Sequence, residues 1–176
     1  ADEGGSEVVF GVARAWAAQD GDAAERWARS LADGTLAGDA LGGVACARAA
    51  TDLNSAVGLA ASIPEGLGRA EALSAVVKAW APQDAAAASE WLGALPHGMS
   101  RDAAIRSFVG VVAKSAPASA TAWAASIDDA ALRTTTIREP AGYWLAQDAQ
   151  AASQWILSTP SVPDAVKQEL LALLRP

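Results

Sequence analysis

The sequence predicts an all-α protein, an α-solenoid of five 32-residue helix-turn-helix repeats followed by a C-terminal capping helix. The first observation is the tryptophan spacing, because Trp91, Trp123 and Trp155 follow one another at intervals of 32 residues. The second is a position that is alanine in every repeat: Ala24, Ala56, Ala88, Ala120 and Ala152. The third is that apolar residues recur at spacings of three and four, which is the period of one helical face.

The repeats divide the chain from Val8 to Lys167 without a gap. They cover residues 8–39, 40–71, 72–103, 104–135 and 136–167. Residues 1–7 are acidic and rich in glycine, and we expect them to form a flexible N-terminal segment. Residues 161–176 overlap the end of the last repeat, are rich in leucine and predict the capping helix.

Each repeat is predicted to hold two amphipathic helices. The apolar stripe of the first helix contains the column Val9, Leu41, Leu73, Ile105 and Ile137. In the second helix, a large apolar residue follows the alanine column after three residues: Trp27, Leu59, Trp91, Trp123 and Trp155. We expect the alanines to let helices approach closely and the tryptophans to fill the wedge between neighbouring helix pairs. Because helices of about 12 residues are too short to persist alone, packing between repeats must hold them.

Residues that cap or end helices lie where a two-helix repeat requires them. An aspartate stands between the two stripes in four repeats and is expected to cap the second helix: Asp20, Asp52, Asp84 and Asp148. The fourth repeat lacks this aspartate, so Ser115 is predicted to be the cap, with Pro117 in the first helical turn. Turn-forming residues close the repeats: Asp33-Gly34, Pro64-Glu65-Gly66, Pro96-His97-Gly98 and Pro160.

The final segment departs from the repeat pattern. The repeat register would place Glu169 at a core position, so we expect this helix to be rotated relative to the others. Its predicted inward face then consists of Val166, Leu170, Leu173 and Leu174.

The repeat is clearest in Trp80-Ala81, Asp84, Ala87-Ala88, Trp91, Leu95-Pro96 and Gly98. This pattern resembles the helical-hairpin repeats of bacterial α-solenoid proteins, in particular tetratricopeptide-like units with a small residue in the middle of the second helix. The aspartate that opens the second helix also resembles HEAT-type repeats. The period differs from the tetratricopeptide value of about 34, and the Leu-Gly and Tyr signature and the HEAT Val-Arg pair are absent. The resemblance implies a scaffold for proteins or peptides, without specific binding residues.

Composition argues against several classes of protein. The chain has 20 acidic and 13 basic residues and a net charge of −7, which is unlike a nucleic-acid binder. It has no long uncharged apolar run that would predict a membrane span. The single cysteine, Cys46, excludes an internal disulfide and is typical of a small buried thiol. Alanine and tryptophan usage suggests a bacterial source, and both cytoplasmic and exported (periplasmic) locations stay open.

No enzyme motif is present in the sequence. It contains no Gly-rich phosphate loop, no H-E-x-x-H and no G-x-S-x-G. His97 lies in a turn without a recurring base or nucleophile, and Asp128-Asp129 in the equivalent turn are more typical of a solvated turn than of paired carboxylates. The tryptophans could stack on a sugar or a cation, but their apolar partners favour packing. We therefore expect no catalytic residue, no cofactor and no metal site.

One charge asymmetry points to a binding surface. On the first helices, five positions opposite the apolar stripe are basic and none is acidic. In tetratricopeptide-like arrays the first helices face a concave groove, so these residues would line a mildly basic groove floored by Gly, Ala and Ser. Such a groove would bind an acidic peptide or a peptide carboxylate. Its predicted residues are Arg14, Lys78, Arg106, Lys114 and Arg138, with Tyr143 at the flank and Glu139 as the nearby acid.

The favoured interpretation is a non-catalytic scaffold that binds a protein or peptide partner. The competing explanation for the basic residues is an ordinary solvent-exposed helix face on which positive charges have gathered by chance. A second class of function is a homotypic structural protein whose repeats continue from one chain to the next, particularly through the leucine-rich final helix, and give a homo-oligomer. An enzyme or its accessory subunit is the remaining alternative, and a pocket holding titratable groups would support it.

Overall fold

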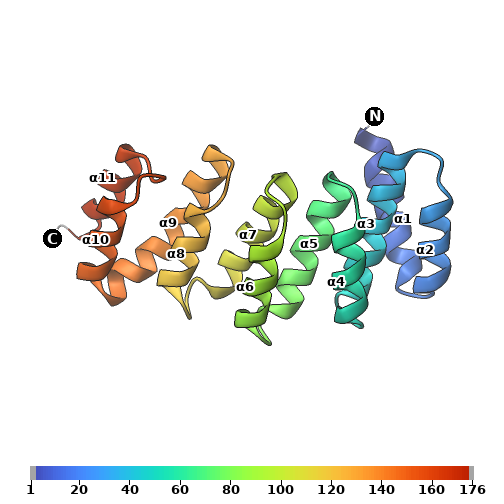
Figure 1. The fold of residues 1–176 in the computed structure, drawn as a ribbon, viewed down its shortest axis with the longest axis horizontal. Coiled ribbons are helices and arrows are strands. Elements are labelled where there is room, and N and C mark those ends of the chain that lie inside the picture. Colours follow the sequence, from blue (N-terminus) through green and yellow to red (C-terminus); the bar gives the residue numbers. More distant parts are fainter. Residues whose placement is uncertain (1–2, 175–176) are drawn as a thin grey trace. The chain divides into compact units, whose positions relative to one another are not determined.

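The computed structural model describes residues 3–174, which form eleven α-helices and no β-strand (Figure 1). The first helices of successive hairpins are α1 (Glu3–Ala17), α3 (Gly34–Arg48), α5 (Leu67–Trp80), α7 (Met99–Val112) and α9 (Ala130–Gln147). The second helices are α2 (Gly21–Ser30), α4 (Leu53–Ser62), α6 (Ala85–Ala94), α8 (Pro117–Ala125) and α10 (Ala149–Ser158). Each second helix begins 32 residues after the previous one, so the all-helical repeating hairpin architecture is confirmed.

The helices form two compact units that divide within α7. Unit 1 extends to Ala104 and contains α1 to α6, and unit 2 begins at Ile105. In unit 1 the first helices pack on one another, α1 on α3 and α3 on α5, and each also contacts second helices. The first and second helices of this unit therefore lie in two layers, with α2, α4 and α6 in the second layer (Figure 1).

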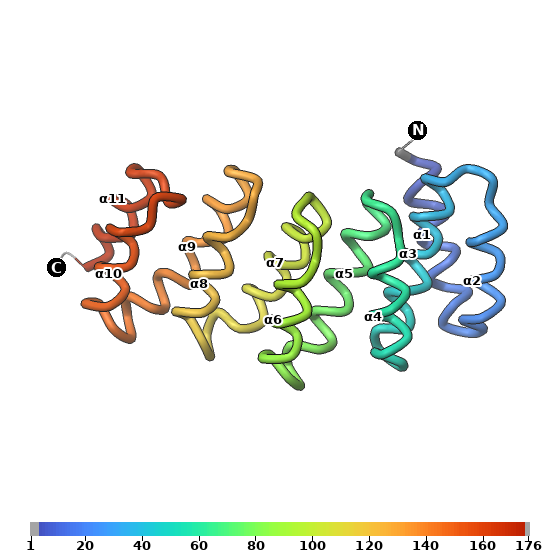
Figure 2. Tube along the Cα trace, in the orientation of Figure 1, coloured from blue at the N-terminus to red at the C-terminus, as the bar shows by residue number. Residues whose placement is uncertain are grey.

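Unit 2 is built around α9. This helix packs against α8 and α10, and the last helix, α11 (Asp164–Ala172), contacts both α9 and α10 (Figure 2). The inward residues Val166 and Leu170 of α11 are buried, as predicted. Leu173 and Leu174 were predicted to share that face, but both are exposed because the helix ends at Ala172.

The N-terminal segment also differs from the expectation. Residues 3–7, which were predicted to be flexible, belong to the first turns of α1. Ala1 and Asp2 lie outside the described residues. The helix extends this far because Ser6 is buried, which anchors its first turns to the rest of unit 1.

The second-helix caps follow the sequence closely. Each of the four predicted aspartates accepts the backbone N–H of the third residue after it: Asp20, Asp52, Asp84 and Asp148. The prediction for α8 is wrong, since its N-cap is Ala116 without a side-chain bond and the Ser115 hydroxyl donates to the Val112 carbonyl. Pro117 at the first position needs no N–H acceptor, so this helix begins without the aspartate.

The predicted core columns are buried. All five alanines of the invariant column are fully buried in the second helices. The first-helix column is equally covered at Leu73, Ile105 and Ile137. A residue larger than alanine at the invariant column has no open space to enter, which explains why the column carries only a methyl group.

In four hairpins, a tryptophan of the second helix packs on an aromatic ring of the first helix. Ring centroids are 5.7–5.9 Å apart in four pairs: Trp16–Trp27, Trp80–Trp91, Phe108–Trp123 and Trp144–Trp155. The tilted and edge-on arrangements are those that aromatic quadrupoles favour. Six of these seven indoles are partly buried, Trp16 is exposed and Phe108 is buried, so the aromatic rings pack on one another at the edge of the core.

Neighbouring first helices of unit 1 approach closely at glycines. A Cβ atom on Gly43 of α3 would lie 2.4 Å from the Phe10 carbonyl oxygen of α1. On the other side of α3, a Cβ atom on Gly42 would lie 2.4 Å from the Gly68 carbonyl oxygen of α5. Neighbouring first helices therefore meet backbone to backbone, which brings the exposed side chains of α1, α3 and α5 close together.

Candidate functional site

The first helices of unit 1 carry two of the five predicted basic residues. Arg14 of α1 and Lys78 of α5 are exposed, and Cys46 of α3 lies between them in the same repeat column. Burial raises the pKa of the Cys46 thiol to about 11, although the charges of Arg14 and Lys78 oppose this shift. Cys46 is therefore a protonated, weakly reactive thiol at neutral pH.

Small side chains surround Arg14. A shallow cavity of about 540 Å³ between α1 and α3 is lined by Arg14 and Cys46 together with glycine, alanine and threonine residues. Small residues thus line the cavity beside Arg14. Arg14 is exposed beside this cavity, so a carboxylate could approach its guanidinium.

A second row of side chains lies on the same three helices and was missed by the sequence analysis. Glu7, Asp39 and Glu71 occupy one repeat column, seven residues before Arg14, Cys46 and Lys78. Seven residues correspond to two helical turns, about 10 Å along the axis. We call these three residues the carboxylate row. The row and the residues Phe10, Leu67, Ser6 and Gly68 line a cavity of about 390 Å³, which we call the carboxylate cavity.

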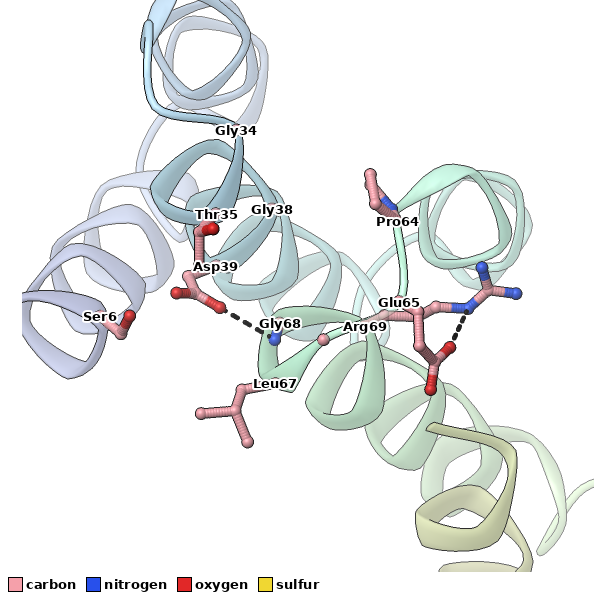
Figure 3. A pocket seen from close by; sticks show the side chains of 11 residues that line it. Ser6, Gly34, Thr35, Gly38, Asp39, Pro64, Glu65, Leu67, Gly68 and Arg69 are labelled. Atoms are coloured by element: carbon pink, nitrogen blue, oxygen red, sulfur yellow. Dashed lines mark hydrogen bonds and ion pairs between the residues drawn. The ribbon is translucent and has the colours of Figure 1, made fainter. Parts of the chain in front are cut away.

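Asp39 is the centre of the carboxylate row. Its side chain accepts a hydrogen bond from the Gly68 N–H at 3.1 Å, so a residue of α3 caps the N-terminus of α5. The residue is only 5% exposed, and its other carboxylate oxygen, Oδ2, has no hydrogen-bond partner among the described residues. Figure 3 shows the carboxylate turned toward the space between Ser6 and Leu67, with one oxygen bonded to Gly68.

Asp39 also lines a neighbouring cavity of about 490 Å³, whose wall includes Glu65 and Arg69 (Figure 3). The carboxylate of Glu65 accepts the Ser100 N–H at 2.8 Å and lies 3.8 Å from the Arg69 guanidinium. Its charge is therefore balanced within the protein. The two cavities differ in this respect, because no basic residue lines the carboxylate cavity.

In unit 2 the predicted residue Arg138 is held by the protein itself. Its guanidinium donates to Glu169 of α11 at 3.0 and 3.1 Å and to the Thr134 carbonyl at 3.2 Å. Hydrogen bonding to Glu169 raises the pKa of Arg138 above its ordinary value. The expected rotation of the final helix thus gives Glu169 a structural partner, and Arg138 is less available to a ligand than the sequence suggested.

Lys114 and Tyr143 of unit 2 lie together, as a cation above a ring. The Lys114 ammonium is 5.9 Å from the centroid of the Tyr143 ring, and the Tyr143 hydroxyl donates to Glu139 at 3.1 Å. Arg106 is exposed and lines a hollow of about 310 Å³ together with Glu139. The acid predicted to be nearby therefore lies among these basic residues and offsets part of their charge.

The remaining residues considered for catalysis are a helix cap and an exposed loop residue. Asp129 caps α9 by accepting the Leu132 N–H at 2.7 Å, and His97 is exposed in the loop before α7. Within residues 3–174, no group of three or more His, Cys, Asp or Glu side chains could hold a metal ion. In the same range, no helix has the length and apolar character needed to cross a bilayer.

The fold and this surface define an all-helical protein of repeating hairpin-like architecture. Compared with protein families, curated proteins and solved structures, the chain matches none of them.

Proposed function

We propose that the chain is a non-catalytic scaffold of the α-solenoid type, resembling tetratricopeptide-like and HEAT-like proteins, that binds a protein or peptide partner. The observation that supports this most directly is the surface of unit 1, where three first helices packed side by side expose Arg14 and Lys78. Repeated helices offer a long, regular row of side chains, which suits an extended segment of another chain.

The partner's recognised group is an acidic side chain or a C-terminal carboxylate. The cavity beside Arg14 has room for such a group, and its alanine and glycine walls let a peptide backbone approach. Guanidinium–carboxylate hydrogen bonds are among the stronger polar contacts in proteins. Unit 2 by itself exposes Arg106 and Lys114, whereas its Arg138 is engaged by Glu169.

A fluorescently labelled hexaglutamate peptide tests this proposal by anisotropy. We expect Arg14→Gln/Lys78→Gln to weaken binding about tenfold, which corresponds to about 1.4 kcal/mol. Binding to the wild type should also weaken as salt is added, because the contacts are exposed. Arg26→Glu is the matched control, since it changes the net charge by the same amount on α2, in the second layer. Equal affinity for the double variant and the wild type, or equal loss in the control, would contradict the proposal.

A second candidate function, homotypic end-to-end assembly, is favoured by the outer face of α1. Val8, Val12 and Trp16 form a stripe on this helix and are 64%, 50% and 38% exposed. Their equivalents in α3 are covered: Ala40 and Val44 are fully buried, and Arg48 binds Asp22 and Glu25 of the preceding hairpin. The stripe is thus the face that in α3 receives a preceding hairpin. Since the equivalent face of α3 packs against a hairpin of this chain, a hairpin from a second copy of the chain could pack against the stripe on α1.

Sedimentation velocity across a wide concentration range tests the assembly. We expect the weight-average mass to rise above 17.8 kDa with concentration, and Val12→Glu to abolish the rise. Met99→Glu is the control, because Met99 is an equally exposed apolar residue on a different helix. A mass that stays at the single-chain value at every concentration excludes this function and leaves the peptide-binding proposal intact.

A further inference from the structure

The carboxylate cavity has a chemical character opposite to that of the basic residues on the same helices. Its three acidic residues come from α1, α3 and α5, and no lining residue is basic. Glu7 and Glu71 are exposed at its rim, while Asp39 lies at its floor. A positively charged group entering the cavity would meet a carboxylate from each of the three helices.

The walls of the cavity are apolar. Leu67 is 62% exposed, although it lies at the first position of a helix whose other apolar side chains are mostly buried. Phe10 of α1 lines the cavity as well, and an aromatic face attracts a cation by its quadrupole. An alkyl chain that ends in a cation matches both parts, because its stem can lie on apolar surface while its head reaches the acids.

Asp39 supplies an observation independent of the acidic column, because its Oδ2 atom is buried and accepts no hydrogen bond from the described residues. A buried carboxylate oxygen that accepts no hydrogen bond is unfavourable, and such groups in native structures require an explanation. The neighbouring Gly68 N–H is already used by the other oxygen. A hydrogen-bond donor that reaches this oxygen would therefore satisfy an acceptor that the described residues leave unpaired.

We infer that the carboxylate cavity binds an alkyl cation, the ammonium or guanidinium group of a lysine or arginine side chain on a partner peptide. The carboxylates accept hydrogen bonds from the cation, and Leu67 and Phe10 contact its stem. The inference adds a second specificity to the proposed function and does not depend on Arg14 or Lys78. If both sites act together, the roughly 10 Å between the rows corresponds to about three residues of extended peptide. The preferred segment then carries a cationic residue about three positions from an acidic one.

Small probes test the cavity without a known partner. The amide spectrum of ¹⁵N-labelled protein is followed during titration with n-butylammonium, with n-butylguanidinium and with the neutral analogue 1-pentanol. We expect saturable shifts of the Leu67 and Gly68 amides with at least one cation, in the millimolar range typical of fragments. The cation that binds more tightly identifies the side chain, lysine-like or arginine-like. No saturable shift with either cation, or equal affinity for 1-pentanol, would overturn the inference.

Variants separate charge recognition from folding. Glu7→Gln/Glu71→Gln should weaken cation binding at least fivefold, since both residues are exposed and neither caps a helix. Asp39→Asn keeps a side-chain oxygen that can accept the Gly68 N–H. Adding it to the double variant should weaken cation binding further. Arg26→Gln is the control, because Arg26 is an exposed cation on α2, outside the cavity, and its loss should leave cation binding undiminished. Unchanged cation affinity in the double variant overturns the inference, whereas hexaglutamate binding reports on the proposed function separately.

Discussion

Replacing Gly43 by alanine is expected to destabilise the protein by about 3 kcal/mol, at the upper end of the usual cost of overpacking. The added methyl group would meet the backbone of α1, at 2.4 Å from the Phe10 carbonyl oxygen and 2.9 Å from the Arg14 nitrogen. Backbone atoms cannot rotate away as a side chain can, so α1 and α3 must separate. That separation weakens the surface on which both proposed binding sites lie.

Gly58→Ala is the control for this prediction. Gly58 is also a helical glycine, in α4, but apart from its chain neighbours and the backbone of its own helix no described atom lies within 4 Å of the position that its Cβ would occupy. Alanine is favoured over glycine in a helix by about 0.5–1 kcal/mol, so this variant should be slightly stabilised. Urea unfolding monitored by circular dichroism compares the two midpoints. A midpoint for Gly43→Ala at or above that of the wild type would show that the two helices do not meet as described.

Local features of the hairpins could be predicted because they repeat. The aspartate caps depend only on a residue type and its distance from the next helix, and Asp20, Asp52, Asp84 and Asp148 all act as predicted. The invariant alanine column is equally direct, since its burial follows from helical periodicity. A feature present in every repeat is in effect observed five times in one chain.

Features that occur once could not be predicted in this way. Gly42 and Gly43 are adjacent glycines of α3, and this pair does not recur at the equivalent positions of the other repeats. The repeat pattern therefore gives no sign that they contact neighbouring helices. The alanine column was expected to set the helix spacing instead. Whether a glycine is required depends on what faces it. That information comes from the packed helices, not from the repeat period.

Arg48 shows how an exception to a column can carry information. It occupies the position of Trp16 and Trp80, and its guanidinium binds Asp22 and Glu25 of the preceding hairpin. Burial of Glu25 opposes its ionisation, but hydrogen bonds from Arg29 and Arg48 outweigh this and lower its pKa. A cation replaces an aromatic pair here, and the sequence signal was a charged residue in an otherwise apolar column.

The candidate site was predicted in part. Arg14 and Lys78 are exposed, but Arg138 is bonded to Glu169, which depends on how α11 is rotated. The carboxylate row is present in the sequence as acidic residues at one repeat column of the first three hairpins, a pattern that an ordinary solvated face also gives. Its chemical interest also depends on the unpaired Asp39 oxygen, which no sequence pattern reveals.

Trp91→Ala in α6 is expected to lower the free energy of unfolding by about 3 kcal/mol, the lower end of the range for removing a large aromatic side chain. Trp91 is partly buried and packs on Trp80 of the same hairpin, with 5.9 Å between ring centroids. Its loss removes apolar contact area and leaves the Trp80 ring without its partner. Trp91→Phe should recover most of the stability, because a ring is retained.

Trp16→Ala provides the matched comparison, since Trp16 forms the same kind of pair with Trp27 at 5.8 Å but is 38% exposed on the outer face of α1. The smaller buried area predicts a loss less than half of that at Trp91. Urea unfolding gives both free energies, and hydrogen exchange of amides in α5 and α6 locates the loss. Equal destabilisation by the two variants would mean that the ring pair alone, rather than its burial between helices, sets the stability of a hairpin.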